Sequence, residues 1–288
     1  MQGGRVHARN KLNELTGREW LRFTKSWFVC DSRRYHQNRD TELHPARFPE
    51  EMVAEFLLFF TKAGEWALDP FVGSGATLVS CAETGRRGVG VEIAAKYAQI
   101  AATRALGQHV ICGDAAGMGE PGFWDGLPAE MERTAEGLPA FDFVMTSPPY
   151  WDMLRQSRGN VFSAHKERAA KALDTHYTDE PGDLGNEPDY ETYIERTGQV
   201  FDLCAGLLRA GRYLVVVAQN LRTPEGGVKP LAWDLQARIS QSLSFQGERI
   251  WCQDSKRLGI WGYPSVFVPN YHHHYCLIFR KQEAGAGR

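Results

Sequence analysis

A glycine-rich turn between a short apolar run and a helical pattern most constrains how this chain can fold. The run Glu65–Asp69 predicts a buried strand, the turn occupies Asp69–Thr77, and a helix is expected through about Thr84. Gly73 and Gly75 allow the tight turn and let a ligand approach backbone N–H groups closely. Because ligands of open α/β sheets bind beyond the carboxyl ends of strands, this turn is a candidate binding site.

Strand and helix patterns alternate along the rest of the chain. Strand patterns return at 88–92, 109–114, 141–146, 212–218, 247–253 and 274–281, and helical patterns occur at 48–60, 94–106, 190–209 and 230–243. This alternation predicts an α/β fold with a mostly parallel sheet that is covered on both faces. The last two strands are expected to form a β-hairpin, so the final strand of seven should be antiparallel.

The length of 288 residues and a hydrophobic content of 43% suit one large domain. We expect residues 1–42 to form a basic arm that packs on a domain of residues 43–288, with short recognition inserts at about 151–189 and 254–272. The formal net charge is −2, but residues 1–40 carry nine Lys or Arg against four Asp or Glu. Such a local excess of positive charge can neutralise phosphates.

The cysteines and the apolar runs indicate the compartment. The six cysteines form no C-x-x-C pair, which argues against a zinc site or a disulfide framework and suits a reducing cytoplasm. No apolar run approaches the ~18 residues that span a bilayer, and the N-terminus lacks a signal-peptide core. In the run His272-His-His274, only the first and third side chains can share a face of a strand, and no further ligand is suitably spaced. We therefore expect a soluble, cytoplasmic protein without a metal.

Two more acids follow the glycine-rich turn at predicted strand ends. Glu92 ends the second strand and can accept hydrogen bonds from ribose hydroxyls, and Asp114 ends the third and can accept from an adenine amino group. The turn lacks the Lys-Ser/Thr pair of a triphosphate-binding loop. Leu78 stands where a dinucleotide fingerprint needs its third glycine, which disfavours NAD. The pattern favours another cofactor that contains a nucleoside.

A second motif, Thr146-Ser-Pro-Pro-Tyr150, ends the fourth predicted strand. The hydroxyl of Ser147 and the carbonyl of Pro148 can accept hydrogen bonds from the two N–H bonds of an exocyclic amino group, which directs the nitrogen lone pair outward. The consecutive prolines Pro148 and Pro149 make this turn rigid. Tyr150 is expected to stack on a base, with Trp151 as a second aromatic wall. A base in a duplex would have to be flipped out to reach this pocket.

Both motifs resemble those of the S-adenosylmethionine-dependent DNA amino-methyltransferases, over roughly residues 10–281. The resemblance implies a Rossmann-like methyltransferase fold with seven strands, the last antiparallel. It implies that the first motif binds the methionine part of the cofactor, while Glu92 binds the ribose and Asp114 the adenine. The element His44–Pro49 resembles the family segment that closes over the methionine end. The resemblance thus implies that the cofactor contacts Pro45 in one element and Asp69, Pro70, Phe71, Gly73, Gly75 and Thr77 in the other, and also Thr146.

Within that family, serine before Pro-Pro-Tyr usually accompanies cytosine N4 methylation, and aspartate or asparagine accompanies adenine N6 methylation. Ser147 therefore favours cytosine N4, with adenine N6 as the alternative. Cytosine C5 methylation is disfavoured because none of the cysteines follows a proline. The resemblance thus implies a site-specific DNA methyltransferase of the restriction-modification type.

Several alternatives stay open at this point. An RNA base methyltransferase and a non-catalytic DNA-binding subunit are both compatible with parts of the pattern. The glycine-rich turn precedes the Ser-Pro-Pro-Tyr motif, whereas the common family arrangement is the reverse. Because the candidate inserts are short, we expect a short DNA target, a homodimer or modest specificity.

Overall fold

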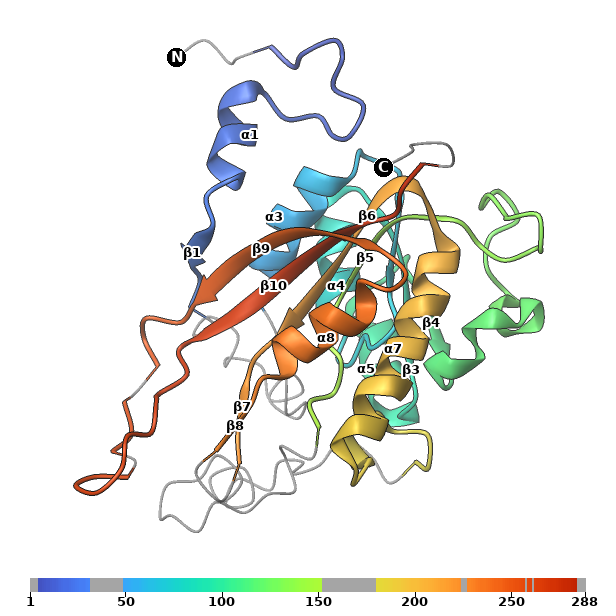
Figure 1. Ribbon diagram of the computed structural model, residues 1–288. Helices are drawn as coiled ribbons and strands as arrows, with labels where there is room; N and C mark the ends of the chain where they lie inside the picture. Colours follow the sequence, from blue (N-terminus) through green and yellow to red (C-terminus); the bar gives the residue numbers. More distant parts are fainter. Residues whose placement is uncertain are drawn as a thin grey trace.

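The computed structural model describes residues 5–31, 49–151, 180–223, 227–256, 258–260 and 262–283. In these ranges an eight-stranded sheet has the order β1-β9-β10-β6-β5-β2-β3-β4 (Figure 1). The strands are β1 (Trp27–Val29), β2 (Trp66–Asp69), β3 (Arg87–Glu92), β4 (His109–Cys112), β5 (Phe141–Thr146), β6 (Leu208–Ala218), β9 (Ser244–Cys252) and β10 (His273–Arg280). A separate two-stranded sheet pairs β7 (Leu221–Arg222) with β8 (Val228–Lys229).

The strand directions confirm the predicted fold class. Strand β10 pairs antiparallel with both β6 and β9, and the other pairs in the large sheet are parallel. The fold is therefore Rossmann-like, with the expected hairpin at its C-terminal end. The sequence predicted seven strands, and the eighth is the short edge strand β1, which pairs with β9.

Helices cover both faces of the sheet. Helices α3 (Glu50–Phe60), α4 (Ala76–Thr84) and α5 (Ala95–Arg104) lie on one face, and α7 (Tyr190–Leu207) and α8 (Leu231–Ile239) lie on the other. Three short 3-10 helices, η2 (Ala115–Gly119), η3 (Pro121–Trp124) and η4 (Leu184–Asn186), lie in the connections. Every residue of β2 and β5 is buried, because these neighbouring strands run between the two helical layers. Their carboxyl ends, Asp69 and Thr146, meet at one edge of the sheet.

The apolar positions of residues 14–28 fit one amphipathic helix, but the N-terminal segment is a shorter helix followed by a strand. Helix α1 covers only Gly17–Phe23, because a capping box of Thr16 and Glu19 starts it and Thr24 ends it. The chain then turns into β1, whose central Phe28 pairs with Trp251. Phe23 stacks on Phe59 of α3 with ring centroids 3.9 Å apart. Tertiary packing against α3 and β9 thus replaces a longer helix.

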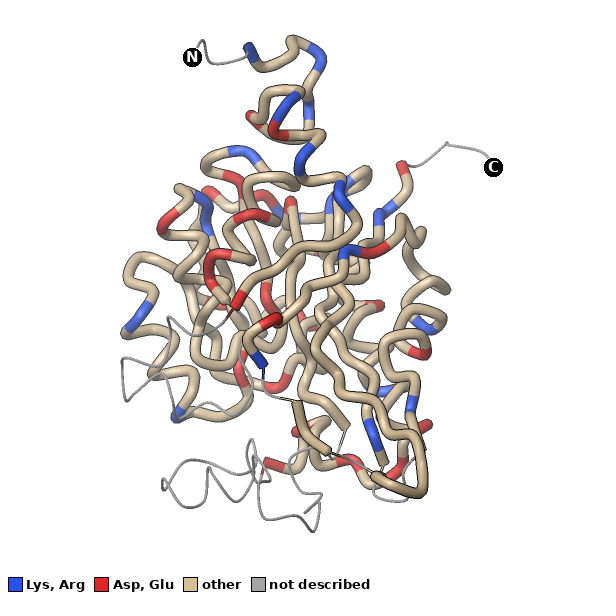
Figure 2. Tube along the Cα trace, turned by 90° about the vertical axis from the view of Figure 1, so that its left-hand side faces the viewer, with Lys and Arg blue, Asp and Glu red and all other residues tan. Residues whose placement is uncertain are grey.

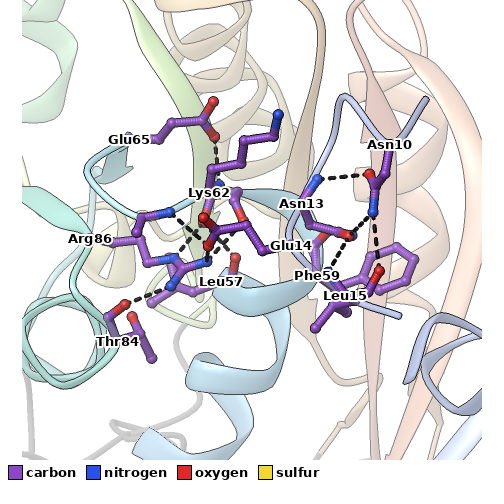
Figure 3. A network of polar contacts seen from close by, with 12 residues as sticks. Asn10, Asn13, Glu14, Leu15, Leu57, Phe59, Lys62, Glu65, Thr84 and Arg86 are labelled. Carbon is purple, nitrogen blue, oxygen red and sulfur yellow. Dashed lines mark hydrogen bonds and ion pairs between the residues drawn. The ribbon is translucent and has the colours of Figure 1, made fainter. Parts of the chain in front are cut away.

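Polar contacts attach this segment to the end of α3 (Figure 3). The side chain of Asn13 donates a hydrogen bond to the carbonyl of Phe59, and Glu14 lies 3.7 Å from Arg86. The Arg86 guanidinium is buried and also donates to the hydroxyl and carbonyl oxygens of Thr61. Arg86, which lies in the connection between α4 and β3, therefore links the N-terminal segment to the C-terminal end of α3.

Charge is unevenly distributed over the described surface. Figure 2 shows basic residues gathered on the N-terminal segment, with basic and acidic residues interspersed elsewhere. Residues 5–31 contain six Lys or Arg and three Asp or Glu. In the described ranges, no helix combines the length and the apolar character needed to cross a membrane.

Candidate active site

The glycine-rich turn is held against the sheet by its own backbone. The Val72 amide donates to the carbonyl of Val91 at 3.0 Å, which ties the turn to β3. Gly75 has a φ of 89° and caps the N-terminus of α4, a conformation that favours glycine. Gly90 faces Val72 so closely that a Cβ at this position would lie 2.7 Å from the valine side chain. The turn therefore lies directly on the carboxyl end of β3.

Asp69 joins the two sequence motifs. Its carboxylate accepts hydrogen bonds from the hydroxyls of Thr77, at 2.5 Å, and Thr146, at 2.6 Å, and from the amide of Phe71, at 3.1 Å. Burial raises the pKa of this carboxyl to about 6, although the three hydrogen bonds oppose the shift. Asp69 thus connects the glycine-rich turn to the start of the Ser-Pro-Pro-Tyr motif.

Glu92 supports the opposite side of the turn. Its two carboxylate oxygens accept from the amides of Gly73 and Ala94, each at 2.9 Å. Burial raises its pKa to about 7, and the charges of Asp183 and Asp69 add to the increase. Each carboxylate oxygen keeps a further lone pair, so Glu92 can still accept from a ligand.

Asp114 follows β4 and caps η2 by accepting from the amide of Ala116 at 2.9 Å. The segment that precedes α7 packs beside it, because a Cβ added to Gly182 would overlap the second oxygen of Asp114. The neighbouring Asp183 lies near enough to Glu92 to influence its pKa. Residues 182 and 183 therefore border the acids at the ends of β3 and β4, a contact that no sequence pattern indicated.

The remaining predicted cofactor residues are distributed around this turn. Pro70 and Thr77 are buried, while Phe71 is half-buried and meets Phe201 of α7 edge to face. Pro45 and the rest of 44–48 lie outside the described residues. Within the described part of the chain, Asp69, Glu92 and Asp114 form no ion pair with a lysine or arginine. Asp69 is buried, so the half-buried Glu92 and the exposed Asp114 form the acidic surface beside the turn, which suits a ligand with hydrogen-bond donors.

The Ser-Pro-Pro-Tyr motif leaves β5 beside this surface. The carbonyl of Pro149 accepts a hydrogen bond from Tyr193 of α7 at 2.9 Å. Among the described residues, the carbonyl of the buried Pro148 has no hydrogen-bond partner. Within the same described residues, the hydroxyl of Ser147 makes a single long contact, 3.4 Å from the hydroxyl of Tyr150. Two acceptors, on Ser147 and Pro148, therefore stand at the end of β5 with hydrogen-bonding capacity to spare.

Tyr150 and the following Trp151 are more deeply buried than aromatic side chains that are exposed for stacking on a base. Tyr150 is 6% exposed, and its hydroxyl lies 3.5 Å from the carbonyl of Val217. Trp151 is half-buried and meets Tyr190 at a ring-centroid distance of 5.1 Å. The stacking role expected for Tyr150 and Trp151 stays a prediction. Tyr190 and Tyr193 were missed from the sequence, although their spacing on one helix face was a usable signal.

Comparison with known proteins finds similarity to DNA methyltransferases over part of the chain. Residues 7–103 match the family model described as DNA methylase. The chain is 42% identical over 65 residues to the type II methyltransferase M.Cfr9I of Citrobacter freundii, covering 23% of this chain and 22% of that protein. It is 43% identical over 61 residues to the type II methyltransferase M2.DpnII of Streptococcus pneumoniae, covering 21% and 23%. The matched region thus spans less than a quarter of either relative.

Among solved structures, the crystal structure of TrmN from Thermus thermophilus aligns with a TM-score of 0.47 and 12% sequence identity. The alignment covers 81% of this chain and 48% of that chain.

Proposed function

We propose that this chain, a member of the S-adenosylmethionine-dependent amino-methyltransferase family by its match over residues 7–103, methylates the N4 amino group of cytosine in DNA. The observation that carries the proposal is the hydrogen bond from Thr146 to Asp69, 2.6 Å long. This hydrogen bond brings the acceptor oxygens of Ser147 and Pro148 next to the glycine-rich turn. Adenine N6 is the second candidate position, because both bases present an amino group.

The cofactor fits the chemistry of the turn. S-adenosylmethionine brings an ammonium, a sulfonium, two ribose hydroxyls and an adenine amino group, which suit the acidic surface of Glu92 and Asp114. When bound, it supplies an electrophilic methyl carbon. Glu92 would hold the ribose and Asp114 the adenine amino group. Asp69 acts chiefly on the protein itself, since its oxygens already accept three hydrogen bonds.

The residues of the Ser-Pro-Pro-Tyr motif would prepare the nucleophile. An amino group conjugated with a base ring is a weak nucleophile because its lone pair is delocalised. By accepting from its two N–H bonds, Ser147 and Pro148 would direct that lone pair towards the methyl carbon. The nitrogen then forms the new N–C bond while the S–C bond breaks and sulfur keeps the electron pair. The proton on nitrogen leaves afterwards, so no strong general base is needed.

The base must leave the stack before it can reach this pocket. A flipped base would enter over the end of β5, where the Tyr150 ring borders the site. The basic residues of the N-terminal segment are candidates for phosphate contacts elsewhere on the duplex.

One assay tests the proposal. The full chain is incubated with labelled S-adenosylmethionine and unmethylated plasmid DNA, or with total RNA, and the modified nucleosides are identified after digestion. N4-methylcytosine is the expected product, and N6-methyladenine would support the second candidate. Label found only in RNA, or in neither nucleic acid, would contradict a DNA methyltransferase.

A further inference from the structure

Three polar residues share one face of the β9–β10 hairpin, at the same edge of the sheet as the Ser-Pro-Pro-Tyr motif. Trp251 and His274 are directly paired in the sheet. The backbone N–H of Gln253 donates a hydrogen bond to the backbone carbonyl of His272 at 2.7 Å. Since side chains alternate along a strand, the two pairs lie on the same face, two residues apart. We call Gln253, His272 and His274 the hairpin polar cluster.

Each member of the cluster has a buried polar atom that forms no hydrogen bond within the described part of the chain. These atoms are Oε1 of Gln253, Nε2 of His272 and Nδ1 of His274. Buried polar atoms nearly always have hydrogen-bond partners, so three orphans on adjacent positions indicate a missing ligand. The three side chains as a whole are half-buried.

The cluster lies on the substrate side of the proposed active site. The ring of His274 stacks on Trp251 at 4.6 Å and lies 6.4 Å from the ring of Tyr150. In the sheet, β10 and β9 lie on one side of β5, and the cofactor acids on β2, β3 and β4 lie on the other (Figure 1). A ligand bound at the cluster would therefore be part of the nucleic acid substrate rather than of the cofactor.

We infer that the hairpin polar cluster binds the edge of a nucleobase of the DNA, an inference that rests on the proposed function. Amide and imidazole groups present both donors and acceptors, which matches the mixed pattern of a base edge. In the described residues no group of three or more His, Cys, Asp or Glu is placed to hold a metal.

The charge state of His274 agrees with this role. Burial lowers its pKa to about 3, so the ring is neutral at physiological pH and offers one donor and one acceptor. The neutral ring can thus contribute hydrogen bonds to a base without adding a charge.

The next residue provides a matched control. His273 points to the opposite face of β10, where its Nε2 lies 3.2 Å from the hydroxyl of Tyr275. His273→Phe, His274→Phe and Gln253→Met are compared with the parent chain for methylation of unmethylated plasmid DNA. His274→Phe and Gln253→Met should lower kcat/KM for DNA about tenfold, and His273→Phe should stay within about twofold. The dissociation constant for S-adenosylmethionine should not change in any of them.

Thermal stability separates a binding role from a structural one. Removing an unsatisfied buried atom is neutral or stabilising, so the Tm of His274→Phe and Gln253→Met should be unchanged or higher. A fall in Tm that parallels the loss of activity would overturn the inference. Activities equal to that of the parent chain would also overturn it, because the cluster would then hold only water.

Two further measurements identify which base is bound and separate failure of this inference from failure of the proposed function. A lower kcat indicates the target base, whereas a higher KM with altered sites in the sequenced plasmid indicates a neighbouring base. If the parent chain transfers no methyl group, the proposed function fails. Anisotropy of a fluorescent duplex cut from the plasmid then tests the cluster by affinity alone, and equal affinities would reject it.

Discussion

The hydroxyl of Tyr193 donates a 2.9 Å hydrogen bond to the carbonyl of Pro149, which links α7 to the proposed catalytic turn. Tyr193 is fully buried, and it lies in the first turn of a helix whose N-cap, Asp189, accepts from the amide of Thr192. Because this bond occupies the carbonyl of Pro149, our proposal assigns the carbonyl of Pro148 to the amino group of the substrate. We therefore propose that Tyr193 positions the turn.

Replacing Tyr193 with phenylalanine removes this hydrogen bond and keeps the ring. We expect kcat for DNA methylation to fall about tenfold or more, because small misplacements of reacting groups are costly. The KM for DNA and the dissociation constant for S-adenosylmethionine should change little. Steady-state kinetics together with cofactor titration measure this separation.

Tyr190 provides the control for Tyr193. It stands three residues earlier on the same helix, and its hydroxyl donates to Asp234 at 2.6 Å, away from the proline carbonyls. Tyr190→Phe should cost about 1 kcal/mol of stability, as one lost hydrogen bond does, and leave kcat nearly unchanged. Equal losses of kcat in the two variants would show that α7 acts only through stability.

Asp69→Ala should remove the link between the two motifs. The buried hydroxyls of Thr77 and Thr146 would lose their shared acceptor, so the free energy of unfolding should fall by about 2–4 kcal/mol. Asp69→Asn keeps a carbonyl acceptor and should lose less stability. Denaturant unfolding measures this difference, and isothermal titration measures the loss of cofactor affinity. Unchanged affinity in Asp69→Ala would refute our assignment of the turn to the cofactor.

Cofactor affinity should rise with pH through the pKa of Glu92. That pKa is about 7 in the free protein, so at pH 6 most of the carboxyl is protonated and must release its proton before both oxygens can accept from the ribose hydroxyls. Between pH 6 and 8 the affinity for S-adenosylmethionine should therefore increase about tenfold. Glu92→Gln should bind more weakly and lose this pH dependence. A steep dependence that persists in the variant would assign it to another group.

Local sequence signals were sufficient for the elements that carry the site. The bounds of β5 were predicted correctly as 141–146, because a mostly apolar run ends at a turn with two prolines. The meeting of Asp69 with Thr146 is a consequence of parallel strands that end at one edge. Signals of this kind depend on neighbouring residues, so one sequence contains them.

Contacts between distant segments were beyond such signals. Strand β1 exists because Trp27–Val29 finds a partner in β9, more than 200 residues later in the chain. The apolar positions of 14–28 fit a helix equally well, and only packing decides between the two. The contacts of Tyr193 with Pro149 and of Gly182 with Asp114 depend in the same way on how α7 docks.

Ser147→Ala tests the proposed catalytic turn most directly. The variant removes one of the two acceptors for the amino group, and we expect kcat to fall about 100-fold or more. Stability should change little, because the one contact of the serine hydroxyl with the described residues is the long 3.4 Å contact with Tyr150. Tyr150→Phe removes the other partner of that contact and keeps the ring, so it should retain most activity. Methyl transfer to plasmid DNA is measured for both, with cofactor affinity as the reference. Full activity in Ser147→Ala would reject Ser147 as an acceptor and, with it, the mechanism proposed for the Ser-Pro-Pro-Tyr motif.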